Sequence, residues 1–327
     1  MFRFVYPLYL SSSVSLVREI RAEHTVRTYN RSVVLPKAST TAKMSNNPNI
    51  KKYFDVARKL TLEAGEVFKF GFRGEKLVES KEIETDLVTD YDRKLEEMLI
   101  KGLLSEFPDH KIIAEETVSE TKQIPKLTDD PTWLIDPIDG TLNFVHTFPQ
   151  CCISIALSIC KEIVIGIVYN PMNSEMYTAI KGEGAFLNDE RIHSTKVTEL
   201  KKALSTVETF ALNLCSKNRD IKLGRFEAMV AASQGVRSIG SAALTMAYIA
   251  NGSIDCFHLD VLQPWDIAAG LLIVREAGGT VIDTRGGPYD FMKPNTIAAA
   301  SASLAQEISK LIIDTDLKTQ RKRLQRK

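Results

Sequence analysis

Residues 133–141 read Trp-Leu-Ile-Asp-Pro-Ile-Asp-Gly-Thr, and this stretch decides the predicted fold. Its first three residues form a short apolar run, which predicts a buried strand. The run ends at Asp136. Pro137 has no backbone N–H to continue a ladder, so we expect the chain to leave the sheet there. Asp139-Gly140-Thr141 then turns toward residues 142–145, which can open a helix. Two carboxylates therefore lie close together at a strand end, followed by backbone N–H groups at a turn.

These residues alone leave two interpretations open. Asp-Pro and Asp-Gly are common turn-forming pairs, so the stretch can be a surface turn. Carboxylates are also the hard oxygen ligands that Mg²⁺ prefers, and backbone N–H groups at a helix start suit a phosphate.

Two other acidic sites favour the second interpretation. The apolar run 112–114 ends at Glu115-Glu116. Asp266 lies in the first turn of a helix predicted over 267–277, with Pro264 near its first position. Three acidic sites therefore follow or begin predicted elements. Solvated acids do not need this placement, whereas a cluster that holds cations does.

Together these three motifs resemble the signature motifs of the inositol monophosphatase family, Mg²⁺-dependent and lithium-sensitive phosphomonoesterases. The motifs are Glu115-Glu116, the run from Asp136 to Thr141, and Trp265-Asp266, and the resemblance covers roughly residues 49–313. It implies an α+β fold with a layered αβαβα architecture and a homodimer. It also implies hydrolysis of inositol monophosphates.

The resemblance further implies two to three Mg²⁺ ions in the site. Glu115, Asp136 and the Ile138 carbonyl would hold one ion. Asp136, Asp139 and Asp266 would hold a second, and a third would use Glu115 and waters. The acidic cluster would repel itself without cations, so we expect Mg²⁺ to stabilise the protein.

The same resemblance assigns roles around the ions. Glu115 and Thr141, with Thr141 oriented by Asp92, would position and deprotonate the attacking water. The phosphate would lie on the N–H groups of Gly140 and Thr141. The expected substrate contacts are Asp139, Gly140, Thr141, Gly240, Ser241, Ala242 and Asp266. Residues 240–242 are small, which lets the backbone approach a ligand or lets one helix pack tightly on a neighbour, and the sequence does not separate the two.

Four further residues are weaker candidates. Lys81 and Asp86 match site positions of the family but are equally typical of a surface loop, and Glu116 is a candidate as the second acid of its pair. Asp260 is a candidate because of a departure: the glutamate expected seven residues before Asp266 is Leu259 here. A local shift would let Asp260 replace it. The loop expected after Glu208 also differs from the family pattern, so both departures concern substrate recognition and leave the residues of hydrolysis unchanged.

The remaining pattern predicts helices mixed with strands throughout. We expect helices over 50–70, from Thr89 to Leu104, 226–234 and 304–313, and strands over 152–159, 162–169, 203–209, 254–258 and 297–300. A polar linker near 198–202 is the only candidate for a domain boundary within the body of the chain. We therefore expect one domain over 44–317, an N-terminal extension over 1–43 and a basic tail over 318–327.

Charge is distributed unevenly along the 327 residues, whose net charge is +1. Residues 1–43 hold seven Arg or Lys and two Glu, and residues 318–327 hold six Arg or Lys and no acid. The body is therefore acidic, which fits a metal site and argues against nucleic acid as a partner. No run is long enough to span a membrane. The five Cys are odd in number and lack a Cys-x-x-Cys spacing, which predicts reduced thiols.

Two interpretations of the N-terminus remain open. Its Ser- and Arg-rich, acid-poor composition is typical of a mitochondrial transit peptide. Alternatively, translation from Met44 gives a cytoplasmic protein that starts just before the first predicted helix.

Two alternatives to an inositol monophosphatase also remain open. One is a phosphatase for another small phosphomonoester, such as a sugar phosphate or 3′-phosphoadenosine 5′-phosphate. The other is a non-enzymatic phosphosugar-binding relative.

Overall fold

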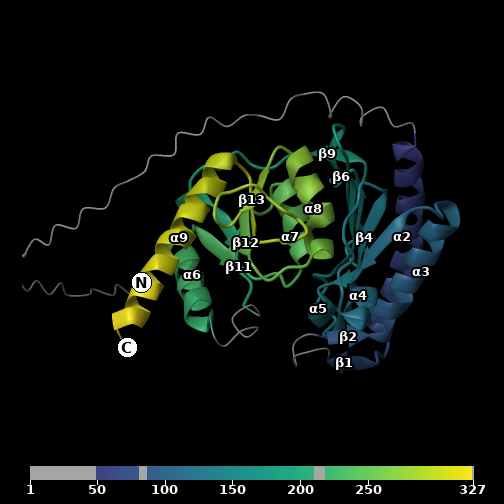
Figure 1. The fold of residues 1–327 in the computed structure, drawn as a ribbon, viewed down its shortest axis with the longest axis horizontal. Coiled ribbons are helices and arrows are strands. Elements are labelled where there is room, and N and C mark those ends of the chain that lie inside the picture. The colour runs from purple at the N-terminus through teal and green to yellow at the C-terminus, as the bar shows by residue number, and fades with distance from the viewer. Residues whose placement is uncertain (1–48, 81–86, 210–217, 326–327) are drawn as a thin grey trace, which may run out of the picture. The chain divides into compact units, whose positions relative to one another are not determined.

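The computed structural model describes residues 49–80, 87–209 and 218–325, which belong to one compact unit over 43–327. Figure 1 shows layers of helix and sheet that alternate across this unit. The predicted αβαβα architecture is confirmed, and each layer follows from where the sequence places its apolar side chains.

The larger sheet has seven strands. Its first pair is parallel and the other pairs are antiparallel, as the predicted series of hairpins requires. In spatial order the strands are β3 (Lys111–Ala114), β4 (Thr132–Asp139), β5 (Cys152–Ile159), β6 (Glu162–Asn170), β7 (Glu175–Ile180), β8 (Gly184–Leu187) and β9 (Glu190–Ile192).

Two amphipathic helices cover one face of this sheet. They are α2 (Ile50–Arg73) and α3 (Asp90–Glu106). The inward stripe of α2 includes Phe54, Ala57 and Phe68, which are buried in one core with side chains of β4, β5 and β6. A hairpin of β1 (Val78–Ser80) and β2 (Leu87–Thr89) joins the two helices. Thr89 begins α3, as predicted, and forms a capping box with Asp92.

The smaller sheet has five strands, in the order β11 (Gly235–Arg237), β10 (Leu204–Thr206), β12 (Cys256–Leu259), β14 (Thr296–Ala299) and β13 (Thr280–Asp283). Helices α7 (Ala242–Ala250) and α8 (Pro264–Glu276) lie between the two sheets. They share one apolar core with strands of both sheets, which explains why α8 is buried without interruption over 267–274.

The outer layer consists of α6 (Arg219–Ala232) and α9 (Ala302–Gln325), which pack on the far side of the smaller sheet (Figure 1). The remaining described elements are short: α4 (Glu115–Thr121), α5 (Thr141–Val145) and a 3₁₀ turn, η1 (Leu200–Lys202). The candidate domain boundary at 198–202 thus falls between the last strand of the larger sheet and the first strand of the smaller one.

Several predicted boundaries were wrong, including that of the strand expected over 203–209, which spans only Leu204–Thr206. The chain does not leave the sheet at Pro137: β4 continues to Asp139 because a register shift between Asp136 and Asp139 accommodates the proline. Helix α6 starts at Arg219, earlier than its weak pattern indicated. Helix α9 continues through Gln325, so the described part of the expected basic tail is helical.

Membrane-spanning helices and disulfide bonds are assessed for the described residues only. No helix among them is long and apolar enough to cross a membrane. The described cysteines, Cys151, Cys152, Cys160 and Cys256, are free thiols.

Candidate active site

The three acidic motifs converge on one pocket of about 210 Å³, between the end of β4 and the starts of α4, α5, α7 and α8. Nine of the predicted site residues line it: Glu115, Asp136, Ile138, Asp139, Gly140, Thr141, Gly240, Ala242 and Asp266. Segments more than a hundred residues apart in sequence therefore meet here, and the surface-turn interpretation of residues 136–141 is excluded.

The irregular end of β4 orients its acids. Asp136 is buried, and its Oδ1 accepts a hydrogen bond from the backbone N–H of Ile138 at 3.0 Å. Gly140 follows with φ +90°, and a Cβ there would lie 3.0 Å from the carbonyl oxygens of Gln150 and Gly240. Only glycine fits this turn without strain, and the turn lets α5 begin at Thr141 on the pocket wall.

Asp139 is held by the start of α7. Its Oδ2 accepts hydrogen bonds from the Ser241 hydroxyl at 2.5 Å and from the Ala243 N–H at 2.7 Å. Ser241 also caps α7 through the N–H of Leu244. Ser241 is 2% exposed and does not line the pocket. Its hydroxyl positions Asp139, and its role as a substrate contact stays a prediction.

Thr141 and Asp92 meet, as the family resemblance implied. The Thr141 hydroxyl lies 3.2 Å from Asp92 Oδ1 and 3.0 Å from the Ile138 carbonyl oxygen. The other oxygen of Asp92 accepts bonds from the backbone and hydroxyl of Thr89 at 2.8 and 2.5 Å. The carboxylate of Asp92 therefore has two roles, because one oxygen caps α3 while the other faces Thr141.

Glu115 is presented to the pocket by a buried acid that the sequence analysis missed. The carboxylate of Glu96 accepts bonds from the N–H groups of Glu116 (2.7 Å) and Thr117 (2.8 Å) and from the Thr117 hydroxyl (2.6 Å). It thus caps α4, whose first residue is Glu115. Glu116 is buried and does not line the pocket. The available signal was a glutamate on the inward face of α3, where an apolar residue is expected.

Asp266 occupies the position predicted for it. It lies in the first turn of α8, after Pro264, and its Oδ2 accepts a bond from the N–H of Gln263 at 2.7 Å. The capping box fixes the backbone here, so the acid faces the pocket from a rigid helix start.

The acids of the pocket influence one another's ionisation. Burial, followed by the charges of Glu115, Asp139 and Asp266, raises the pKa of Asp136 well above its ordinary value. Burial raises the pKa of Asp139 to about 6, although the bonds from Ser241 and α7 act in the opposite direction. Carboxylates that hinder each other's ionisation are stabilised by a shared cation.

The donor set fits Mg²⁺. The four carboxylates predicted as ligands and the backbone of Ile138 offer hard oxygen atoms in one pocket, and among the described residues no soft ligand lines it. Among the described residues, no three His, Cys, Asp or Glu side chains are already close enough together to enclose a metal ion.

Glu208, another buried acid, also lines the pocket. It accepts bonds from the Ser238 hydroxyl at 3.1 Å and from the N–H groups of Ile239 and Gly240 at 3.1 and 3.0 Å. These bonds hold Gly240, with φ +78°, against Asn143 of α5. The small residues at 240–242 thus both line the pocket and pack closely.

The structure corrects the prediction for Asp260. Leu259 lines the pocket, but Asp260 points to the other side of the chain, where it pairs with Arg225 and accepts a bond from Thr284 at 2.6 Å. Asp260 therefore does not take the place of the expected glutamate, and the wall at this point is apolar. Lys81 and Asp86 lie outside the described residues.

Comparison with known proteins agrees with this geometry. The model of the inositol monophosphatase family matches residues 49–315. The chain belongs to the inositol monophosphatase family. Inositol monophosphatase 3 of Solanum lycopersicum is 40% identical over 270 residues, covering 82% of this chain and 99% of that protein.

Solved structures of the family share the fold. The inositol monophosphatase of Thermotoga maritima is 33% identical with a TM-score of 0.73, covering 82% of this chain and 99% of its own. The Staphylococcus aureus enzyme SaIMPase-II, solved with inositol monophosphate bound, is 27% identical with a TM-score of 0.69. The match covers 84% of this chain and 100% of that enzyme's chain. The predicted family, fold and enzyme class are therefore confirmed: this inositol monophosphatase relative is a phosphatase.

Proposed function

We propose that this phosphatase hydrolyses inositol monophosphates to inositol and phosphate with two to three Mg²⁺ ions, and that lithium inhibits it. The observation that carries the proposal is the pocket itself, where Asp136 lies among Glu115, Asp139 and Asp266 beside the Thr141–Asp92 pair. Bound Mg²⁺ would neutralise the charge of the phosphate and favour ionisation of water.

Side chains and backbone groups of the chain orient the attacking water and bind the phosphate. The Thr141 hydroxyl donates a hydrogen bond toward Asp92 or the Ile138 carbonyl, so its lone pair can accept a hydrogen bond from the attacking water, whose proton can pass through Thr141 to Asp92. Glu115 orients that water from the start of α4. The backbone of Gly140 and Thr141 receives the phosphate. The water oxygen bonds to phosphorus and the ester P–O bond breaks; of the two protons of the water, one ends on the departing alcohol and the other on the phosphate.

Phosphate release from inositol 1-phosphate tests this proposal. We expect release that requires Mg²⁺, is suppressed by Li⁺ and falls by at least about 100-fold in Asp136→Asn. Asp109→Asn, an exposed acid outside the pocket, is the matched control and should behave like wild type. Equal rates for the two variants would refute the assignment of the site.

A second candidate substrate is another small phosphomonoester, such as a sugar phosphate or 3′-phosphoadenosine 5′-phosphate. It is favoured by Leu259, because an apolar side chain offers no partner to a ring hydroxyl. Faster hydrolysis of such an ester than of inositol 1-phosphate would support it.

We further propose a homodimer and a cytoplasmic location for the form that starts at Met44. The exposed apolar side chains Phe70 and Leu77, at 73% and 74% exposure, support an interface. Light scattering measures the mass in solution. Fluorescent fusions that start at Met1 or Met44 test whether residues 1–43 direct the protein to mitochondria instead.

A further inference from the structure

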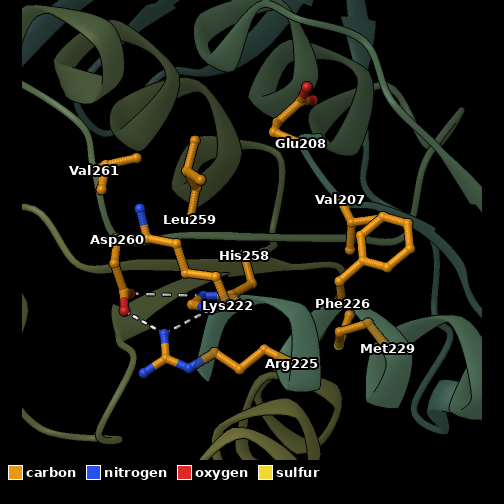
Figure 2. A pocket seen from close by; sticks show the side chains of 10 residues that line it. All are labelled: Val207, Glu208, Lys222, Arg225, Phe226, Met229, His258, Leu259, Asp260 and Val261. Carbon is orange, nitrogen blue, oxygen red and sulfur yellow. Dashed lines mark hydrogen bonds and ion pairs between the residues drawn. The ribbon is translucent and has the colours of Figure 1, made fainter. Parts of the chain in front are cut away.

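A smaller cavity of about 70 Å³ adjoins the active-site pocket, and we name it the side compartment (Figure 2). Glu208, Leu259 and Val261 line both cavities, so the two meet along these three side chains. Val261 is 37% exposed and marks the rim. The volume is several times the roughly 10–15 Å³ that one water needs.

The far wall of the side compartment is apolar. Phe226 and Met229, on one face of α6, and Val207, after β10, lie opposite Leu259 and Val261. None of these five side chains offers a hydrogen bond to a ligand.

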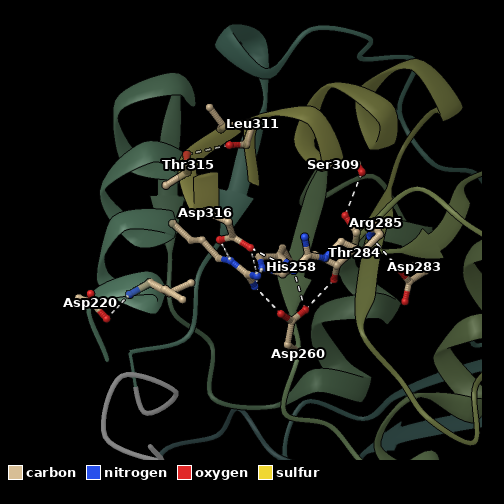
Figure 3. Close-up of polar contacts among 12 residues, drawn as sticks. Asp220, His258, Asp260, Asp283, Thr284, Arg285, Ser309, Leu311, Thr315 and Asp316 are labelled. Atoms are coloured by element: carbon tan, nitrogen blue, oxygen red, sulfur yellow. Dashed lines mark hydrogen bonds and ion pairs between the residues drawn. The ribbon is translucent and has the colours of Figure 1, made fainter. Parts of the chain in front are cut away.

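The guanidinium and carboxylate groups on the floor of the compartment neutralise one another. Arg225 binds Asp316 of α9 through two parallel bonds of 2.7 Å and pairs with Asp260 on its other side. Asp260 also accepts a bond from Thr284, and Arg285 lies 3.4 Å from Asp316 (Figure 3). The two guanidinium groups thus balance the two carboxylates.

His258 belongs to the same floor and is neutral. An arginine only donates, so the Nε2 of His258, 3.3 Å from Arg225, must accept, and its Nδ1 donates to the Thr296 carbonyl oxygen at 3.2 Å. Burial lowers its pKa, in agreement with this tautomer. The carboxylate of Glu208 is likewise bonded to residues 238–240. A hydroxyl-rich ligand group would lose its bonds to water here and gain few in return.

We propose that the side compartment receives an apolar arm on the alcohol part of the substrate, of the size of one ring or a short branched chain. This inference rests on the proposed phosphatase function. The phosphate would occupy the acidic pocket, and the arm would pass Val261 to lie between Leu259 and Phe226. The arm takes no part in the reaction, in which water replaces the alcohol on phosphorus as before.

Three synthetic esters that share a two-carbon linker to the phosphate test the proposal. They are 2-phenylethyl phosphate, its 4-carboxyphenyl analogue and 2-hydroxyethyl phosphate, and inositol 1-phosphate serves as the reference. We expect kcat/KM for the phenyl ester to exceed that for the hydroxyethyl ester by about tenfold, mainly through KM. Lys222 also lines the compartment. If the carboxyphenyl ester is preferred instead, the compartment selects an anionic arm and the proposal is wrong.

A pair of variants on α6 locates the effect. Phe226→Ala should lower the phenyl-to-hydroxyethyl ratio of kcat/KM by at least about threefold. Val230→Ala, an exposed residue of the same helix outside the compartment, should leave the ratio unchanged. Because both esters are measured on one preparation, the ratio does not depend on how much enzyme is folded.

The outcomes separate the two proposals. Hydrolysis of inositol 1-phosphate without preference for the phenyl ester would overturn the side compartment alone. A preference that Phe226→Ala leaves intact would overturn it too. No hydrolysis of any ester would refute the phosphatase proposal and the compartment with it.

Discussion

Glu96 gives the sharpest test of how the site is built, because it touches the site only through the helix that it caps. Replacing Glu96 with Ala removes the acceptor of two backbone N–H groups and one hydroxyl at the start of α4. Thr117 is exposed, so water can replace its partner, but Glu116 is buried. A hydrogen bond to a charged group contributes about 1.5–3 kcal/mol, and loss of a helix cap costs about 1 kcal/mol.

We therefore expect Glu96→Ala to lower the free energy of unfolding by about 3 kcal/mol. Urea unfolding measures it, with a lower midpoint and an unchanged slope. Since α4 starts at Glu115, kcat should also fall by about 100-fold, as misplacement of a reacting group by about 1 Å can cost that much. KM should change less, because Glu96 lies outside the pocket.

The neighbouring residue supplies the control. Glu97 is exposed on the same helix, and Glu97→Ala should stay within about 0.5 kcal/mol of wild type with full activity. If Glu96→Ala loses stability but keeps kcat, the cap does not position Glu115. If the two variants unfold alike, the buried hydrogen bonds of Glu96 do not contribute to the free energy of unfolding.

Four further predictions concern the pocket and the floor of the side compartment. Asp92→Asn should lower kcat by about 100-fold while hydrolysis stays measurable, because Thr141 loses a charged partner; steady-state kinetics decides, and an unchanged kcat would contradict the pairing. Gly140→Ala should cost about 2 kcal/mol in urea unfolding, because its φ is +90° and its Cβ would press on two carbonyl oxygens; wild-type stability would contradict this strain. Mg²⁺ at 100 times its Kd should raise the unfolding free energy of wild type by about 2.7 kcal/mol and that of Asp136→Asn by less, as thermal melts can measure. His258 has a pKa lowered by burial, so its stabilising contribution is present above the unfolded pKa of about 6.5 and is lost as pH falls below it. The difference in unfolding free energy between wild type and His258→Asn should therefore shrink by up to about 1.4 kcal/mol per pH unit in that range, and a constant difference would show that His258 does not titrate on unfolding.

The sequence by itself determined whatever depends on neighbours along the chain. The stripe of α2, the capping box at Thr89 and the proline at the start of α8 are local patterns, and all three predicted elements are present. The three acidic motifs were also visible, because each follows or opens an element. Their order and the family resemblance sufficed to predict that Glu115, Asp136 and Asp266 share one pocket.

Only the tertiary structure decided which side chains support that pocket. Glu96 and Glu208 act on backbone N–H groups 20 and 32 residues away, so no local spacing marks them. The strand direction decided that Leu259 faces the pocket while Asp260 turns to Arg225, since successive side chains of an extended chain point to opposite sides. Pro137 stays within β4 because the partner strand tolerates a register shift, which depends on β5 and not on the proline. Local patterns thus placed the reacting acids, whereas their orientation and the apolar wall beside them depend on contacts between distant segments.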